Sequence, residues 1–216
     1  MYNVVLYVHV LALVYWLGGD LGTFLSSRHV LRSELGVQSR QTAFNILMEC
    51  DMGPRLAMPL ILGSGFHLSS LRWPGLLPDV TALIGWLVVM VWVALVAAIH
   101  SSVGQRFPSL TQWDLRLRFA VVGGLLGVGG YAFTIGLPEW LALKITIFAT
   151  LVACGIAVRF ALKPFAIAYA SMITDGPTDE KNAAMIMHMG VVRRYVWVIW
   201  IGLFVNTALG LHVITF

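Results

Sequence analysis

The amino-acid sequence predicts an all-α fold, a polytopic membrane bundle of about six transmembrane helices forming a single integral membrane domain over residues 1–216. Composition is the first basis for this fold class. Hydrophobic residues make up 59% of the chain and charged residues only 11%, and the mean hydropathy is +0.84, which is atypical of soluble domains. In addition, apolar runs of about 20 residues recur along the whole length, and a helix of that length crosses the hydrocarbon core.

Six apolar runs, separated by polar or turn-forming residues, define the expected helices. The first run lacks a basic leader and is longer than the apolar core of a signal peptide, so we expect a retained span. Turn chemistry at Trp73-Pro74-Gly75, Phe107-Pro108 and Asp175-Gly176-Pro177 separates later runs. The expected helices cover residues 3–26, 42–70, 80–103, 117–135, 140–161 and 195–215. We expect the last two to extend beyond the membrane as amphipathic turns, through Lys163-Pro164 and 180–194.

The distribution of lysine and arginine predicts the orientation, because cytoplasmic loops are enriched in these residues. With alternating spans, one side of the membrane holds Arg72 alone. The pattern predicts that both termini face the periplasm and that the protein lies in a bacterial inner membrane. The excess of basic residues is therefore explained by membrane topology. We expect the lipid bilayer as a partner and no nucleic acid. The other side holds Arg28, Arg32, Arg40, Arg106, Arg116, Arg118, Arg159, Lys163, Lys181, Arg193 and Arg194.

Two basic residues, Arg55 and Lys144, fall well inside expected spans, where a charge is costly and usually has a partner or a function. From the helical rise, Asp20 of the first helix and Arg55 of the second lie at matching depth, so we expect them to pair, with Asp51 nearby. Two interpretations remain open. The pair is either a structural salt bridge or part of a proton route or a clamp for a ligand carboxylate.

Three histidines and Lys144 share a depth in the outer half of the expected bundle. These are His9, His67 and His212 on the first, second and sixth helices. Imidazoles that project from facing helices are common haem ligands, so at least two of these groups are expected to bind iron, with His9 and His67 as metal ligands. Zinc or copper also accept imidazole. A second haem near His29 and His100, at the opposite face, is a further alternative.

A macrocycle needs space and walls beside its ligand. Gly63 lies one turn before His67 and leaves room for a porphyrin, and Trp16 is a candidate pocket wall. Gly63 also fits ordinary small-residue packing between membrane helices, and Trp16 equally fits an interfacial belt. The cofactor-binding set is therefore predicted as His9, His67, His212, Gly63 and Trp16.

Three segments resemble the HemJ-type protoporphyrinogen oxidases and the related CopD-like family of small bacterial haem-binding membrane proteins. They are VHVLALVYWLGG (8–19), PRLAMPLILGSG (54–65) and WLALKITIF (140–148), in the same order as in that group. The resemblance implies a helical bundle that binds haem b, with His9 as the family's first-helix histidine and Lys144 as its functional lysine. It implies removal of hydrogens from protoporphyrinogen IX, with electrons passed towards the respiratory chain.

The expected function is that of a haem b-dependent membrane oxidoreductase, with quinone-linked electron transfer and a porphyrin or quinone substrate. Lys144 and Arg55 are the predicted catalytic residues, and Lys144 either donates a proton or holds a propionate. Its alternative is an amine that reaches the outer interface. Two other functions remain open: a CopD-like copper-handling protein, and a non-catalytic subunit of a respiratory complex. A homo-oligomer or a respiratory partner is expected.

Overall fold

The computed structural model describes residues 1–214 and is all-helical, with no strand in that range. The predicted all-α class is therefore confirmed. The predicted last helix ended at Thr215, which lies outside the described residues. The helices are α1 (Tyr2–Val30), α2 (Val37–Arg72), α3 (Asp79–Ile99), α4 (Ser102–Arg106), α5 (Leu110–Thr134), α6 (Glu139–Asp175) and α7 (Asp179–Gly210).

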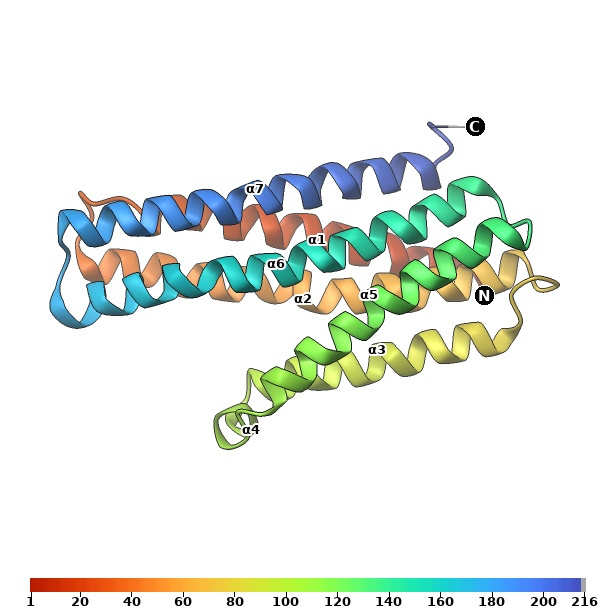
Figure 1. The fold of residues 1–216 in the computed structure, drawn as a ribbon, viewed down its shortest axis with the longest axis horizontal. Coiled ribbons are helices and arrows are strands. Elements are labelled where there is room, and N and C mark those ends of the chain that lie inside the picture. The colour runs from red at the N-terminus through yellow and green to blue at the C-terminus, as the bar shows by residue number, and fades with distance from the viewer. Residues whose placement is uncertain (215–216) are drawn as a thin grey trace.

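The long helices run up and down along one axis, and both termini lie at the same end of the molecule (Figure 1). α1, α2, α6 and α7 are the longest and extend together at the opposite end, whereas α3 and α5 flank the bundle and are joined through the short α4. Sequential helices are thus antiparallel neighbours, as short connections require.

Helices α6 and α7 are longer than the predicted spans and confirm the expected extensions. α6 has 37 residues and α7 has 32, so α6 is about 55 Å long, well beyond a hydrocarbon core of about 30 Å. Their projecting halves bury a second hydrophobic core against the ends of α1 and α2. That core includes Val30, Phe165, Tyr169, Met172 and Met185. This packing explains why the helices continue where the hydropathy falls.

Within residues 1–214, five helices are long and apolar enough to cross a membrane: α1, α3, α5, α6 and α7. They indicate a multi-pass membrane protein. α2 lies outside this set, since Pro54, Pro59, Asp51 and Arg55 interrupt its apolar run. The sixth span and the periplasmic termini stay predictions.

Glycines bring α1 and α2 into close contact. A Cβ at Gly22 would lie 2.7 Å from Cys50 Sγ, and one at Gly53 would lie 3.0 Å from the Tyr15 carbonyl oxygen. A Cβ at Gly19 would collide with the Pro54 ring. Small residues at a seam allow membrane helices to approach closely, and this approach fixes which residues of α1 face which residues of α2.

Arg40 is the largest charged side chain in the second core, with 0% of its surface exposed. Its Nε donates to the Val30 carbonyl at 2.8 Å, and its Nη1 donates to Asn182 Oδ1 at 2.9 Å. Val30 is the last residue of α1, so its carbonyl has no partner within that helix. Arg40 thus caps α1 and ties it to α2 and α7.

Replacement of Arg40 by methionine is expected to lower the free energy of unfolding by about 2–3 kcal/mol. Methionine keeps much of the apolar stem but leaves the Val30 carbonyl buried without a donor. Thermal unfolding in mild detergent measures the change. The control is Arg32→Met, which removes an exposed arginine 3.8 Å from Glu34 and should change little. Equal effects of the two substitutions would contradict the capping role of Arg40.

Candidate functional site

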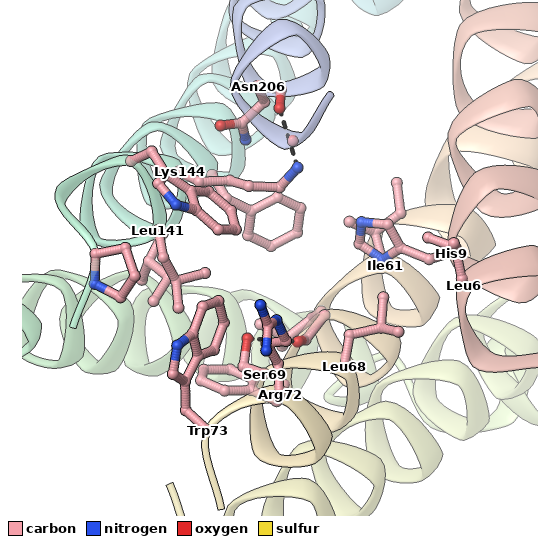
Figure 2. Close-up of a pocket in the computed structure, with 18 of the residues that line it drawn as sticks. Leu6, His9, Ile61, Leu68, Ser69, Arg72, Trp73, Leu141, Lys144 and Asn206 are labelled. Atoms are coloured by element: carbon pink, nitrogen blue, oxygen red, sulfur yellow. Dashed lines mark hydrogen bonds between the residues drawn. The ribbon is translucent and has the colours of Figure 1, made fainter. Parts of the chain in front are cut away.

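A cavity of about 450 Å³ opens at the end of the bundle that carries both termini. It lies between α1, α2, α5, α6 and α7, and most of its walls are apolar side chains, among them Leu6, Ile61, Leu141 and Phe148. Its volume is in the range of small-molecule and cofactor sites. Polar side chains at its walls include His9, Ser69, Arg72, Lys144 and Asn206 (Figure 2). Tyr2 and His212 also line it.

His9 enters the cavity from α1. Its Nδ1 lies 2.8 Å from the hydroxyl of Ser64 on α2, and Ser64 is fully buried. Gly65 lies beside the ring, where a Cβ would be in ordinary van der Waals contact with His9 Cε1, at 3.5 Å. The imidazole is therefore held on one edge by α2, and the other edge is left for the cavity.

Lys144 reaches the cavity from α6, across the open space from His9 (Figure 2). Its Nζ donates a 3.0 Å hydrogen bond to the Asn206 carbonyl, near the carboxyl end of α7, where the helix dipole favours a cation. Gly210 makes room for the amine, since a Cβ there would lie 2.5 Å from Nζ. The amine is thus held at the cavity wall by α7.

Asn206 offers a further polar group. Its side chain is only 7% exposed, yet Oδ1 has no hydrogen-bond partner in residues 1–214. A buried amide oxygen without a donor is costly in a folded protein. A donor from a ligand or a water would satisfy it.

Aromatic rings border the cavity beside His212. The His212 ring meets Trp140 edge to face with centroids 5.0 Å apart, and Trp140 lies 5.8 Å from Trp73. His212 follows closely after the end of α7 and has a positive φ of 54°, a left-handed backbone conformation that is uncommon outside glycine. The His212 side chain is among those that line the cavity.

The charged groups at the cavity are all basic. Arg72 and Lys144 are the arginine and lysine at its walls, and His9 and His212 are the histidines. Within the described residues, the walls contain no aspartate or glutamate. This charge pattern suits an apolar molecule that carries anionic groups.

The remaining predicted cofactor residues lie elsewhere. His67 Nδ1 accepts a 3.2 Å hydrogen bond from Trp86 Nε1 of α3, and His67 is not among the cavity residues. Gly63 packs on Trp86 and Val89 of the same helix. Trp16 is buried in the central core against Phe148, with centroids 6.1 Å apart. The sequence predicts the depth of His67 and Gly63 along α2 but not the face of the helix on which they lie. That face packs against α3.

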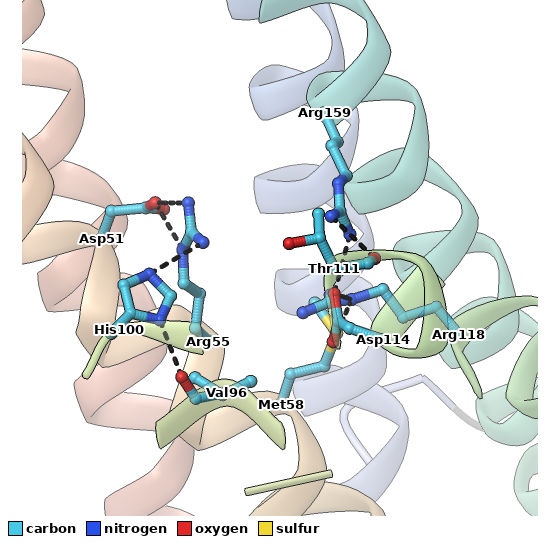
Figure 3. A network of polar contacts seen from close by, with 9 residues as sticks. All are labelled: Asp51, Arg55, Met58, Val96, His100, Thr111, Asp114, Arg118 and Arg159. Atoms are coloured by element: carbon cyan, nitrogen blue, oxygen red, sulfur yellow. Dashed lines mark hydrogen bonds and ion pairs between the residues drawn. The ribbon is translucent and has the colours of Figure 1, made fainter. Parts of the chain in front are cut away.

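Arg55 lies in the inner half of the bundle and pairs with its own helix. Its Nε donates to Asp51 Oδ2 at 2.6 Å, and its Nη1 lies 3.3 Å from His100 Nε2 (Figure 3). The predicted pairing of Arg55 with Asp20 is therefore wrong. Asp20 instead accepts a 3.2 Å hydrogen bond from Trp16 Nε1. Asp51 lies one turn from Arg55 on the same helix, so the two side chains are always close. Asp20 lies on α1, and its distance from Arg55 depends on how α1 and α2 pack.

A second ion-pair cluster was not predicted from the sequence. Asp114 of α5 accepts hydrogen bonds from Arg118 at 3.0 Å and from Arg159 of α6 at 2.7 Å (Figure 3). Asp114 and Arg118 are buried, and the Arg118 guanidinium also lies 5.1 Å from the centre of the Trp92 ring. Both arginines were counted with the cytoplasmic side. The i, i+4 spacing of Asp114 and Arg118 was the available signal.

No group of three or more histidine, cysteine, aspartate or glutamate side chains within residues 1–214 is arranged to hold a metal ion. The two predicted metal ligands, His9 and His67, face different partners, Ser64 and Trp86. Comparison of the chain with protein-family models, with curated proteins and with solved structures finds no match. The cavity is therefore the basis for a proposal about function.

Replacement of Asp114 by alanine is expected to cost about 3–5 kcal/mol of unfolding free energy, because two guanidinium groups lose their shared carboxylate in a buried setting. The matched control is Asp51→Ala, which removes the partner of Arg55 in a pair whose side chains are 34% and 25% exposed. It should cost about 1 kcal/mol or less. Denaturant titration in detergent compares the two. Equal losses would show that Asp114 does not hold α5 to α6.

Proposed function

We propose that the chain crosses a bacterial inner membrane six times, through α1, α2, α3, α5, α6 and α7, with both termini in the periplasm. The loops and helix ends opposite the termini carry most of the lysines and arginines, and the end with the termini carries Arg72. In this orientation the cavity opens toward the periplasmic leaflet. α2 lies beside α1, and its charged residues Asp51 and Arg55 pair with each other.

In this cavity the protein binds haem b and acts as a membrane oxidoreductase. The observation that carries this proposal is the pairing of an imidazole with an amine across one apolar cavity, His9 on α1 and Lys144 on α6. Both are neutral-nitrogen donors when deprotonated, and iron porphyrins are held by such groups from facing helices. His212 lies at the border of the same cavity and is the alternative nitrogen ligand.

The residues divide the work of binding. His9 would hold the iron through the ring nitrogen left free of Ser64, and Lys144 would either complete the coordination or donate a proton at the ring edge. Arg72 at the cavity wall would pair with a carboxylate. The haem supplies single-electron transfer when bound, and the apolar walls exclude water from it.

The basic walls favour a carboxylated porphyrin, here the haem itself, over an uncharged quinone as the molecule inside the cavity. The reaction we propose is porphyrinogen oxidation, in which hydrogens leave a reduced macrocycle that would bind outside the space the haem fills. A quinone or a respiratory partner then accepts the electrons at the membrane. Arg55 lies outside the cavity walls, and in this scheme it stabilises the inner half of the bundle through Asp51.

Expression with added haem, followed by purification in mild detergent, is expected to give a b-type band in reduced-minus-oxidised spectra. His9→Ala should remove at least nine-tenths of the band because the iron loses its imidazole. His67→Ala is the matched control, since its ring bonds Trp86 outside the cavity, and it should retain the band. Loss of the band in His67→Ala but not in His9→Ala would contradict the proposal, as would a wild-type protein without a band.

Cysteine labelling tests the orientation. In a chain with Cys50 and Cys154 replaced by alanine, Gly75→Cys in the α2–α3 turn should react with an impermeant maleimide on intact spheroplasts. Ser33→Cys, in the turn between α1 and α2, should react only after permeabilisation. Both positions are exposed, so reactivity reports the side of the membrane. The reverse pattern would place the termini in the cytoplasm.

A further inference from the structure

Ser64 makes three contacts that together determine where its proton lies. Its hydroxyl oxygen is 2.5 Å from the Leu60 carbonyl oxygen, 3.3 Å from that of Ile61 and 2.8 Å from His9 Nδ1. Ser64 has one hydrogen to donate and two lone pairs to accept with. Two oxygens at 2.5 Å without a proton between them would repel, so the hydroxyl donates to Leu60 and accepts from His9.

The protonation of the His9 ring follows from this assignment. In a neutral imidazole one nitrogen carries the hydrogen and the other a lone pair. Because Ser64 accepts, Nδ1 carries the hydrogen, and the lone pair is on Nε2. Nε2 has no hydrogen bond within residues 1–214, and the His9 ring lies at the cavity wall. An imidazole in this form can give an electron pair to a metal without first losing a proton.

His67 on the same helix shows the opposite arrangement. Its Nδ1 accepts from Trp86 Nε1, so in the neutral ring the hydrogen is on Nε2 and the lone pair is occupied. Two histidines at similar depth thus differ in which nitrogen is free. The difference comes from their neighbours, a serine for His9 and a tryptophan for His67.

We propose that Ser64 is a positioning residue, which holds His9 as the Nδ1–H tautomer with the Nε2 lone pair directed to the cavity, ready for a metal centre. The inference rests on the proposed function for the identity of that metal centre, haem iron, and on the hydrogen bonds alone for the tautomer. Ser64 is fully buried on α2, one turn before Leu68 of the cavity wall, so no solvent competes for the contact. The contact also fixes the ring plane relative to α2.

The tautomer is measured on the protein without haem. Nitrogen-15 NMR of histidine-labelled protein in lipid nanodiscs distinguishes a protonated from an unprotonated ring nitrogen, and His9→Gln assigns the His9 signals. We expect the wild-type His9 to carry its hydrogen on Nδ1. Ser64→Ala should move a substantial fraction to Nε2–H, because the acceptor is gone. Ser64→Thr keeps the hydroxyl and should keep Nδ1–H. Ser70→Ala is the matched control.

Ser70 is suited to that control because it is also buried on α2, and its hydroxyl donates only to the His67 carbonyl, at 3.0 Å. In haem titrations Ser64→Ala should weaken binding about 10- to 100-fold, the usual effect of losing the partner of a ligating histidine, whereas Ser70→Ala should stay within about twofold. The reduced-minus-oxidised band of Ser64→Ala should also shift in position.

The NMR measurement without haem and the haem titration test different claims, the role of Ser64 and the proposed function. A His9 ring protonated on Nε2 in the wild type, or a tautomer unchanged by Ser64→Ala, would overturn the role of Ser64 even if haem binds. Conversely, Nδ1–H in the wild type and its loss in Ser64→Ala would support the positioning role even if the protein takes up no haem. If Ser64→Ala does not fold, the wild-type tautomer and its retention in Ser64→Thr still decide the question.

Discussion

The close packing of α1 against α2 is the constraint on which the site depends. Glycines on both helices remove the side chains that would hold the backbones apart, so Gly22 meets Cys50 and Gly53 meets Tyr15. Beyond that seam α1 and α2 remain neighbours, and a residue of α2 faces His9 further along. That neighbour is Ser64, and the imidazole gains its orientation from it.

Basic side chains have different partners in the two halves of the bundle. In the inner half, Arg118 and Arg159 share Asp114, which offsets one of their two positive charges through bonds that also join helices. In the cavity, the partner of Lys144 within residues 1–214 is a backbone carbonyl. A partly buried cation that lacks an acidic partner leaves electrostatic attraction for an anion that enters. The inner clusters therefore serve stability, and the cavity retains the capacity to bind.

The sequence predicted the position of the histidines and Lys144 along their helices, but it did not predict the direction in which each side chain points. Helical rise and topology together grouped His9, Lys144 and His212, and all three border one cavity. The same counting grouped His67 with them, because distance along a helix says nothing about the face on which a residue lies. Ser64 and His67 are three positions apart, yet they contact α1 and α3 respectively. A helix that is apolar on nearly every side has no polar stripe from which its buried and lipid-facing sides could be assigned.

Partner choice was predictable only where it was local. Arg55 bonds Asp51 one turn away, and this i, i+4 contact needs no knowledge of how helices pack. Lys144 shows the other case, since its partner is a carbonyl on α7, far along the chain. The alternative, an amine that extends to the outer interface, stays a prediction. The carboxyl end of α7 offers a negative dipole inside the bundle, and the amine bonds a carbonyl there, at the cavity wall. A lysine held by backbone alone can move to a new partner without breaking an ion pair, and this distinguishes Lys144 from the arginines of the inner half.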